Sequence, residues 1–529
     1  MHEVEIVLGL LVLVTGLAMV ARAISVPYPI LLVIGGLVIG FVPGLPHVEL
    51  EPDIVFLLFL PPLLFVAAFF ASPRELKANR RPIGSLAVGL VLFTTTVVGV
   101  VAHALLPELG WPVAFALGAI VSPTDAVAAS AIFHRLGVPR RIVTILEGES
   151  LVNDATGLIA YRAAVAAAVT GAFSFAEWGV LFVVVAAGGV VLGLAVGWAV
   201  AQIWKRVHDP VASITISLLA PYAAYLPAEQ LGASGLLAAV AAGLYLGWAW
   251  PRALTGEAAS ETRLQGRAVW GTFEFVLNGL VFVLIGLQLP TILARLGRPI
   301  GELVLVGILI SLTVIVSRFV WVFPATYLPR LLSPWLRRRD PSPPWQWTMM
   351  LSWSGMRGVV SLAAALALPV TVVSGDPFPG REPLIFLTFT VILVTLVGQG
   401  LTLPPLIRAL GLSADGSEER EEAYARAAAA EAALARMDDL EQEWPTHREL
   451  VDQLRARYEH RARHVQQPIA SNGISAVDDE WFEHQEIFRA VIEAERGAVI
   501  SLHDDGAIAD SVLYRVQRDL DLAEARMEA

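Results

Sequence analysis

Three carboxylates, a hydroxyl and an amide lie close together in an apolar segment that runs from Val143 to Val169. They belong to Glu147, Glu149, Asp154, Ser150 and Asn153. The segment is long enough to span a membrane, which takes about 20 mostly apolar residues. A charge at the centre of a bilayer costs at least about 2.5 kcal/mol, so these carboxylates need partners, protons or a transported ion. They are the first candidates for function.

Helical spacing separates these side chains into groups. Ser150 lies four residues before Asp154 and Glu147 lies seven before it, so the three share one face of a helix. Asn153 lies a quarter turn away, and Glu149 points largely elsewhere. The spacing therefore predicts that Ser150 helps Asp154 to bind an ion, whereas Glu149 needs a different partner.

A second aspartate is expected at the same depth. At 1.5 Å per residue, Asp154 lies roughly 16 Å into a hydrocarbon core of about 30 Å. Asp125, in the preceding apolar segment, lies slightly past the middle from the other side. The two carboxylates, the Ser150 hydroxyl and freed carbonyls near Thr124 would form a site of hard oxygens, which suits a small cation. Burial and closeness also favour protonation, so a proton and a cation would compete for one site.

Breaks in two apolar segments are expected to hold this site. Ser122–Asp125 contains a proline, and Gly355–Gly358 contains two glycines and Arg357. Proline removes a backbone donor and glycine loosens a helix, so both segments are predicted to be broken helices. Arg357 is the expected buried partner of Glu149. A second structural pair is expected between Glu274 and Arg318.

Composition predicts an all-α, polytopic membrane protein. The chain has 529 residues, of which 56% are hydrophobic, and its mean hydropathy is +0.65. Thirteen candidate spans begin near residues 4, 28, 53, 83, 111, 143, 176, 211, 233, 268, 303, 346 and 384. The broken spans are the fifth and the twelfth, which run in opposite directions, as in transporters built from two inverted repeats with crossed broken helices. The absence of cysteine excludes disulfides and thiolate metal sites.

Charge predicts the orientation and the domains. Connections after odd-numbered spans carry seventeen Lys and Arg residues, against three after even-numbered spans. This asymmetry places the N-terminus outside and the C-terminus in the cytoplasm, which requires an odd number of spans. From Ala414 onward the chain holds 27 acidic and 13 basic residues. We therefore expect a transmembrane domain over residues 1–410 and an acidic cytoplasmic tail over 411–529, with no nucleic-acid binding.

Two helical regions are predicted in the tail. The first runs from Ser417 to His464, rich in Ala, Glu and Arg, with a break near Pro445. The second begins at about Asp478. Regulatory, assembly and solubility roles all remain open for the tail.

Together, Ser122–Asp125, Gly148–Asp154 and Gly355–Gly358 resemble sodium/proton antiporters of the cation:proton antiporter superfamily. The likeness is to the Asn-Asp branch, which includes animal sodium/hydrogen exchangers and archaeal and bacterial antiporters, and it covers roughly Val4 to Leu406. It implies a transporter of the plasma membrane, not an enzyme, with no cofactor. Such a transporter exchanges one cation for one proton and works in the lipid bilayer as a homodimer, in which a six-helix core moves past a dimerisation domain.

The resemblance also implies roles for single residues. Asp154 would bind the ion and the proton, with Asp125 as its partner. Ser150 and the Thr124 carbonyl would complete the cation shell. In addition, Asn153 would stabilise the site and Glu149 would pair with Arg357. Some members have an acidic residue after the run Pro61–Phe65, where this chain has Val66, so their third carboxylate and their ion preference do not carry over.

Three other functions compete with exchange of Na⁺ for H⁺ as interpretations of the sequence. A K⁺/H⁺ antiporter of the same family is the alternative, because the sequence does not separate Na⁺ from K⁺ or Li⁺. An intramembrane aspartyl protease would also use two midplane aspartates, but its Gly-x-Gly-Asp signature is missing from the predicted spans. A cation channel would not need a proton-titratable pair beside broken helices. Since Asn153 cannot titrate, Asp154 is the main proton carrier and the exchange is expected to be electroneutral.

Overall fold

The computed structural model describes most of the chain, and its described residues form helices and connections. They are residues 2–24, 26–43, 51–171, 174–207, 209–253, 258–296, 299–372, 375–412, 417–466 and 490–502, with 505, 512–513, 516–517, 520 and 523. Two compact units are present, Met1–Asp415 and Gly416–Ala529.

Eight helices of the described part are long and apolar enough to cross a membrane. Five are single helices: α1 (His2–Ala23), α11 (Phe175–Trp204), α12 (Pro210–Gln230), α14 (Ala258–Arg295) and α15 (Ile300–Leu332). Three are composite and contain a π-helical turn: α3 (Pro52–Ile54), turn Val55–Phe59 and α4 (Leu60–Phe70); α6 (Arg80–Gly84), turn Ser85–Leu90 and α7 (Val91–Leu105); α19 (Arg381–Leu393), turn Val394–Gln399 and α20 (Gly400–Ala409).

The other predicted spans fall on helices that are shorter, interrupted or more polar. They are α2 (Tyr28–Gly40), α13 (Gly235–Ala253), α10 (Arg140–Thr170), the pair α8 (Gly110–Val121) and α9 (Val127–Leu136), and the pair α17 (Trp345–Trp353) and α18 (Val359–Leu366). The all-helical class and both predicted breaks are therefore present. The total of thirteen spans and the inverted repeats stay predictions.

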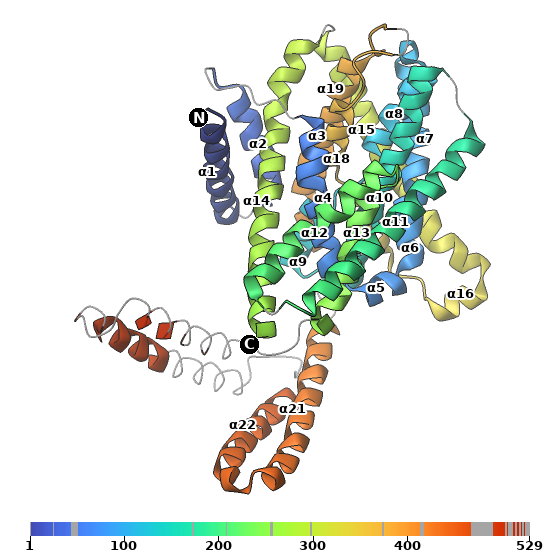
Figure 1. The fold of residues 1–529 in the computed structure, drawn as a ribbon. Helices are drawn as coiled ribbons and strands as arrows, with labels where there is room; N and C mark the ends of the chain where they lie inside the picture. The colour runs from blue at the N-terminus through green and yellow to red at the C-terminus, as the bar shows by residue number, and fades with distance from the viewer. Residues whose placement is uncertain are drawn as a thin grey trace. The chain divides into compact units, whose positions relative to one another are not determined.

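The helices of unit 1 pack against one another in groups (Figure 1). Helix α2 packs along α14 with α1 beside them, while α11, α12, α13 and α4 pack together. Small residues allow this approach: a side chain at Gly36 would overlap the Val283 carbonyl of α14. A large apolar core surrounds α8, α10, α18 and α19, and a second cluster contains Phe65, Trp204 and Trp270.

Unit 2 contains a helical hairpin. Its helices are α21 (Ser417–Glu443) and α22 (Arg448–Gln466), and a 3-10 turn at Pro445–His447 lies at the predicted break between them. Arg455 of α22 bonds to Asp438 of α21 at 2.7 Å, which connects the two helices of the hairpin. The predicted start of the second helical region, near Asp478, lies outside the described residues, although 490–502 is helical.

Candidate ion-binding site

The two helix breaks contact each other directly. Helix α8 ends at Val121 because Pro123 lacks the N–H that would continue it. The backbone N–H of Asp125, in this break, donates to the carbonyl of Met356, in the other, at 2.8 Å. A side chain at Gly358 would overlap the Asp125 carboxylate. Glycine is therefore required at position 358 if the carboxylate is to keep this place.

Arginines satisfy the carbonyls that the breaks leave free. A helix that ends inside a membrane exposes carbonyls that water does not reach. Arg357 Nε donates to the carbonyl of Val121, at the end of α8, at 2.9 Å, and its Nη1 donates to the Gly355 carbonyl. Arg318 Nε donates to the carbonyl of Leu351, near the end of α17, at 2.8 Å. Positive charge at helix C-termini also suits the helix dipole.

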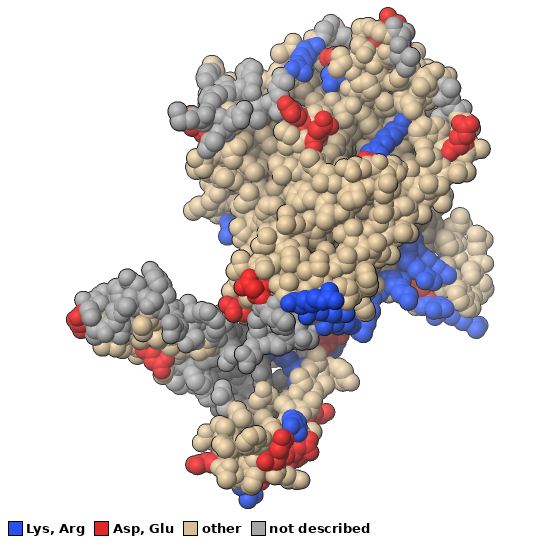
Figure 2. Space-filling model, in the orientation of Figure 1, with Lys and Arg blue, Asp and Glu red and all other residues tan. Residues whose placement is uncertain are grey.

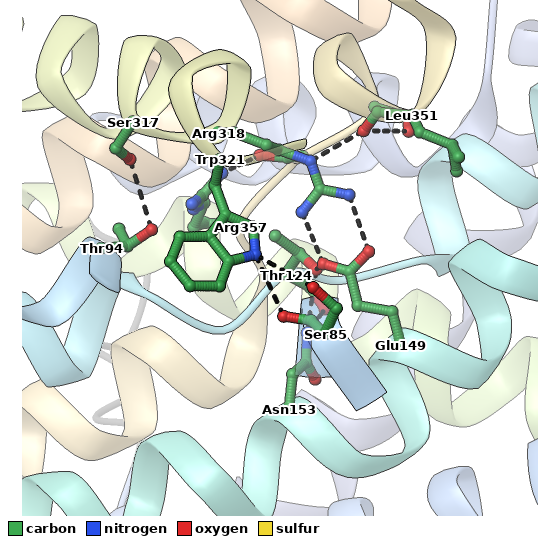
Figure 3. Close-up of polar contacts among 12 residues, drawn as sticks. Ser85, Thr94, Thr124, Glu149, Asn153, Ser317, Arg318, Trp321, Leu351 and Arg357 are labelled. Atoms are coloured by element: carbon green, nitrogen blue, oxygen red, sulfur yellow. Dashed lines mark hydrogen bonds and ion pairs between the residues drawn. The ribbon is translucent and has the colours of Figure 1, made fainter. Parts of the chain in front are cut away.

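Glu149 pairs with Arg318 of α15. The two side chains are each 1% exposed, and both carboxylate oxygens bond to the guanidinium group, at 2.5 and 2.7 Å (Figure 3). The predicted pair of Glu149 with Arg357 is therefore wrong, and so is the predicted pair of Glu274 with Arg318. Arg357 is directed at backbone carbonyls instead, and that leaves Arg318 as the counter-ion.

Thr124 and Asn153 extend this ion pair into a network. The Thr124 hydroxyl donates to Glu149 Oε1 at 2.8 Å. Asn153 Nδ2 donates to the Thr124 carbonyl at 2.9 Å and to the Thr124 hydroxyl at 2.8 Å (Figure 3). Asn153 thus ties α10 to the first break. The Thr124 carbonyl already accepts one hydrogen bond, which leaves one lone pair for the predicted cation.

The amide oxygen of Asn153 has no such partner. Because the Thr124 carbonyl can only accept, the nitrogen of Asn153 must face it, and Oδ1 must face away. Asn153 is fully buried, and its Oδ1 makes no hydrogen bond to any described residue. A buried oxygen without a donor is uncommon in proteins, and it is a ligand that a small cation would accept.

Asp154 and Asp125 differ from Glu149 in their partners. Asp154 is 6% exposed, and its carboxylate makes no hydrogen bond or ion pair within the described part of the chain. One oxygen of the half-buried Asp125 accepts the Val127 N–H at 2.8 Å. The two carboxylates are close enough for their charges to interact. They form an acidic pair without a basic partner among the described side chains.

The remaining predicted site residues lie at different distances from this pair. Ser150 is half-buried one turn before Asp154 on α10, and its hydroxyl bonds to no described residue. Glu147 is a further turn toward the start of α10, where its side chain is 40% exposed and its Oε1 lies 3.5 Å from His134 Nε2. Val66 is buried in the second apolar cluster. Glu147 is therefore on the expected face but outside the acidic pair.

Sequence reasoning missed two functional positions. Arg318 was assigned to Glu274, and the contact of Gly358 with Asp125 was not anticipated. A signal for the first was available, because Arg318 and Glu149 are both deep in apolar spans and each requires a buried counter-ion. Nothing in the sequence indicates which carboxylate faces which glycine across the two breaks.

Residues 9–409 match the family model described as the transmembrane sodium/hydrogen exchanger. The chain belongs to the sodium/hydrogen exchanger family. This exchanger is 34% identical to an uncharacterized Na⁺/H⁺ exchanger of Mycobacterium tuberculosis, over 99% of this chain and 97% of the relative. It is 37% identical to a sodium, potassium, lithium and rubidium/H⁺ antiporter of Bacillus pumilus, over 76% of this chain and 60% of that protein.

A solved structure has the same fold. The sodium proton antiporter MjNhaP1 of Methanocaldococcus jannaschii aligns with a TM-score of 0.61 and 22% identity, over 78% of this chain and 99% of its own. The family and its fold identify this exchanger as a multi-pass membrane protein that exchanges cations for protons. It is a transporter rather than an enzyme, and the intramembrane protease is excluded.

Proposed function

We propose that the exchanger moves one Na⁺ against one H⁺ across the plasma membrane by alternating access of the Asp154–Asp125 pair. The observation that carries this proposal is the absence of a described basic partner for the buried Asp154 and the half-buried Asp125, at the contact of two broken helices. Carboxylates in such a place must hold a proton or a cation. One ligand therefore has to leave before the other binds.

In the proposed cycle, Asp154 exchanges its ligand and the Glu149 network keeps the site in shape. Sodium would bind to the carboxylates of Asp154 and Asp125 with oxygens of Ser150, Thr124 or Asn153, and would displace the proton. The bidentate bond of Glu149 to Arg318 connects α10 to α15, and Asn153 connects α10 to the first break. These bonds would keep the three elements together while the loaded site changes its access from one side to the other, within a homodimer.

Electroneutrality follows from this account and can be tested directly. One proton released for each Na⁺ bound leaves no net charge to cross the membrane, so a membrane potential should barely change the rate. A second proton per cycle would couple to the potential by about 2.3 kcal/mol per charge per 100 mV. Sodium-driven proton flux in proteoliposomes, recorded at several clamped potentials, separates the two. A steep dependence on potential would overturn the one-for-one exchange.

K⁺/H⁺ exchange is the second candidate. The Bacillus pumilus relative is named for sodium, potassium, lithium and rubidium, and Val66 stands where some relatives have an additional carboxylate. Fluorescence dequenching in proteoliposomes with Na⁺, K⁺ and Li⁺, each across a range of pH, identifies the ion. We expect Na⁺ to give the largest response. Competition between H⁺ and Na⁺ for the acidic pair should lower the apparent Na⁺ affinity in acid. A larger response to K⁺ would transfer the proposal to that ion.

A further inference from the structure

A cavity lies within unit 1, at the end of the bundle where α10 begins. Its volume is 230 Å³. Its charged lining residues are Arg81, Arg141, Arg330 and Asp340. Apolar lining residues include Leu86, Ile142, Ile145, Val322 and Leu351. In the predicted orientation this is the cytoplasmic end of α10.

The cavity is polar at one end and apolar toward the membrane interior. Val322 and Arg330, both on α15, line it. Arg330 follows Val322 by eight positions, and a helix rises about 1.5 Å per residue. The cavity therefore reaches about 12 Å inward from its charged mouth. A phospholipid has this same arrangement, with a charged headgroup at the membrane surface and an acyl chain that points inward.

The charges at the mouth are only partly balanced. Arg141 and Arg330 share the carboxylate of Asp340, at 2.8 and 2.5 Å. Arg81 and Arg339 instead both lie over the ring of Trp335, at 5.5 and 5.4 Å from its centroid. Neither makes an ion pair with a carboxylate of the described chain. Two like charges thus share one indole ring, and an anion bound beside the ring would offset their repulsion.

Exposed apolar side chains that follow Arg330 in the sequence indicate where the bilayer begins. Leu331 and Leu332, at the end of α15, are 73% and 76% exposed, and Trp335, in α16 (Pro334–Arg339), is 58% exposed. Arg337 and Arg338 follow on the same short helix. Lys and Arg gather around α5 (Pro73–Ala78) and α16 in Figure 2. Exposed Leu and Trp beside arginines are typical of a membrane–water boundary.

We propose that Arg81, Arg339 and Trp335 form a binding site for one anionic phospholipid, whose acyl chain enters the adjoining cavity that Arg81 also lines. The phosphate would bond to the guanidinium groups beside the indole, and the apolar walls around Val322 would contact the chain. Arg141 is the second residue of α10 and lines the same cavity. The lipid would therefore contact the helix that carries Asp154, so the transport rate should depend on anionic lipid as well.

Lipid binding to the full-length, delipidated exchanger tests the proposal. Affinities for phosphatidylglycerol and phosphatidylcholine would be measured by thermal stabilisation and by native mass spectrometry. Each arginine near an anionic surface contributes a factor of about 5, so the double variant Arg81→Gln, Arg339→Gln should bind phosphatidylglycerol roughly 30-fold more weakly. Phosphatidylcholine binding should not change. Trp335→Leu, which keeps every charge, should also weaken binding, and Trp335→Phe should keep most of it.

The control variant removes the same charge elsewhere. Arg252 and Arg267, on α13 and α14, also lie over aromatic rings, at 4.6 and 5.8 Å. Arg252→Gln with Arg267→Gln should leave phosphatidylglycerol affinity unchanged. If both double variants lost phosphatidylglycerol affinity equally, the loss would depend only on the net charge of the protein, and the proposed site would be overturned. Equal stabilisation by soluble glycerol phosphate would mean a free-phosphate site instead of a lipid site. If the first double variant fails to fold, the two Trp335 variants decide the question.

Discussion

Two acidic positions on α10 differ in their partners although both are buried. Glu149 is 1% exposed and Asp154 is 6% exposed, and about one and a half turns of helix separate them. Glu149 bonds to Arg318 through both oxygens and accepts the Thr124 hydroxyl as well. Asp154 has no hydrogen-bond or ion-pair partner within the described chain. Burial alone therefore does not identify the residue that transports the ion.

The hydrogen-bond and ion-pair partners of each carboxylate identify the transporting residue instead. A carboxylate whose two oxygens bond to a buried guanidinium serves as its counter-ion, and loss of the carboxylate leaves that guanidinium unpaired. A carboxylate without partners is free to bind a proton or a cation, and its loss removes only that ligand. Substitutions at the two positions should accordingly separate transport from stability.

The largest effect is expected from Asp154→Asn. The variant should lose exchange almost completely, by more than about 100-fold, because no other residue would carry the proton. Its thermal unfolding temperature should stay the same or rise, since no bond of the described structure is lost. Sodium-driven proton flux and thermal unfolding of the same preparation check both halves. Substantial flux in the variant would remove Asp154 from the central role.

Glu149→Gln should give the opposite result, with a large loss of stability. Breaking a buried ion pair typically costs about 3 to 5 kcal/mol, because one charge is left unpaired. Combining it with Arg318→Met should recover part of the loss, with a coupling energy of about 2 kcal/mol in a double-mutant cycle. The matched cycle with Arg357→Met should show a smaller coupling, because Arg357 bonds to carbonyls. Equal couplings in the two cycles would contradict the pairing.

Gly358→Ala should weaken cation binding without breaking the Glu149 network. The added methyl group would overlap the Asp125 carboxylate and displace it. A displacement of about 1 Å in a preorganised site can cost on the order of 100-fold, so an increase of tenfold or more in the apparent Na⁺ constant is expected. Gly398→Ala is the control, since no atom lies within 4 Å of its added Cβ. An unchanged Na⁺ constant in Gly358→Ala would separate Asp125 from the site.

Asp340→Asn, outside the spans, should have the smallest effect. Burial alone would raise the pKa of Asp340, but the hydrogen bond from Arg141 and the charges of Arg141 and Arg330 lower it overall. A lowered pKa gives stability that is present above the ordinary range of about 4 and is lost as pH falls through the folded value. The wild type and the variant should therefore differ by under about 1 kcal/mol at neutral pH and converge in acid. If the stability difference between the wild type and the variant grew in acid, the lowered pKa of Asp340 would be contradicted.

Much of this fold could be predicted because a membrane restricts the length and composition of the helices that cross it and the charge of the connections between them. Hydropathy and loop charge predict the apolar helices, and Pro123 with Gly355 and Gly358 marks the two breaks. Depth along a helix predicts that Asp154 and Asp125 meet, because the rise per residue is fixed.

Pairing across helices could not be predicted in the same way. A span such as α15 is apolar on every face, so its pattern does not tell which neighbour Arg318 meets. The assignment of Arg318 to Glu274 failed for this reason. Arg357 was misassigned for another reason, because the breaks expose carbonyls whose positions depend on the folded structure, and these carbonyls take up its guanidinium group.

Proton release on sodium binding tests the central claim most directly. Purified exchanger in lightly buffered solution would be mixed with NaCl while a pH indicator records the protons released, and choline chloride would serve as the control for ionic strength. Competition at the Asp154–Asp125 pair predicts release in the wild type, its loss in Asp154→Asn, and its persistence in Glu149→Gln protein that remains folded. Sodium binding without proton release in the wild type, or undiminished release in Asp154→Asn, would contradict the account.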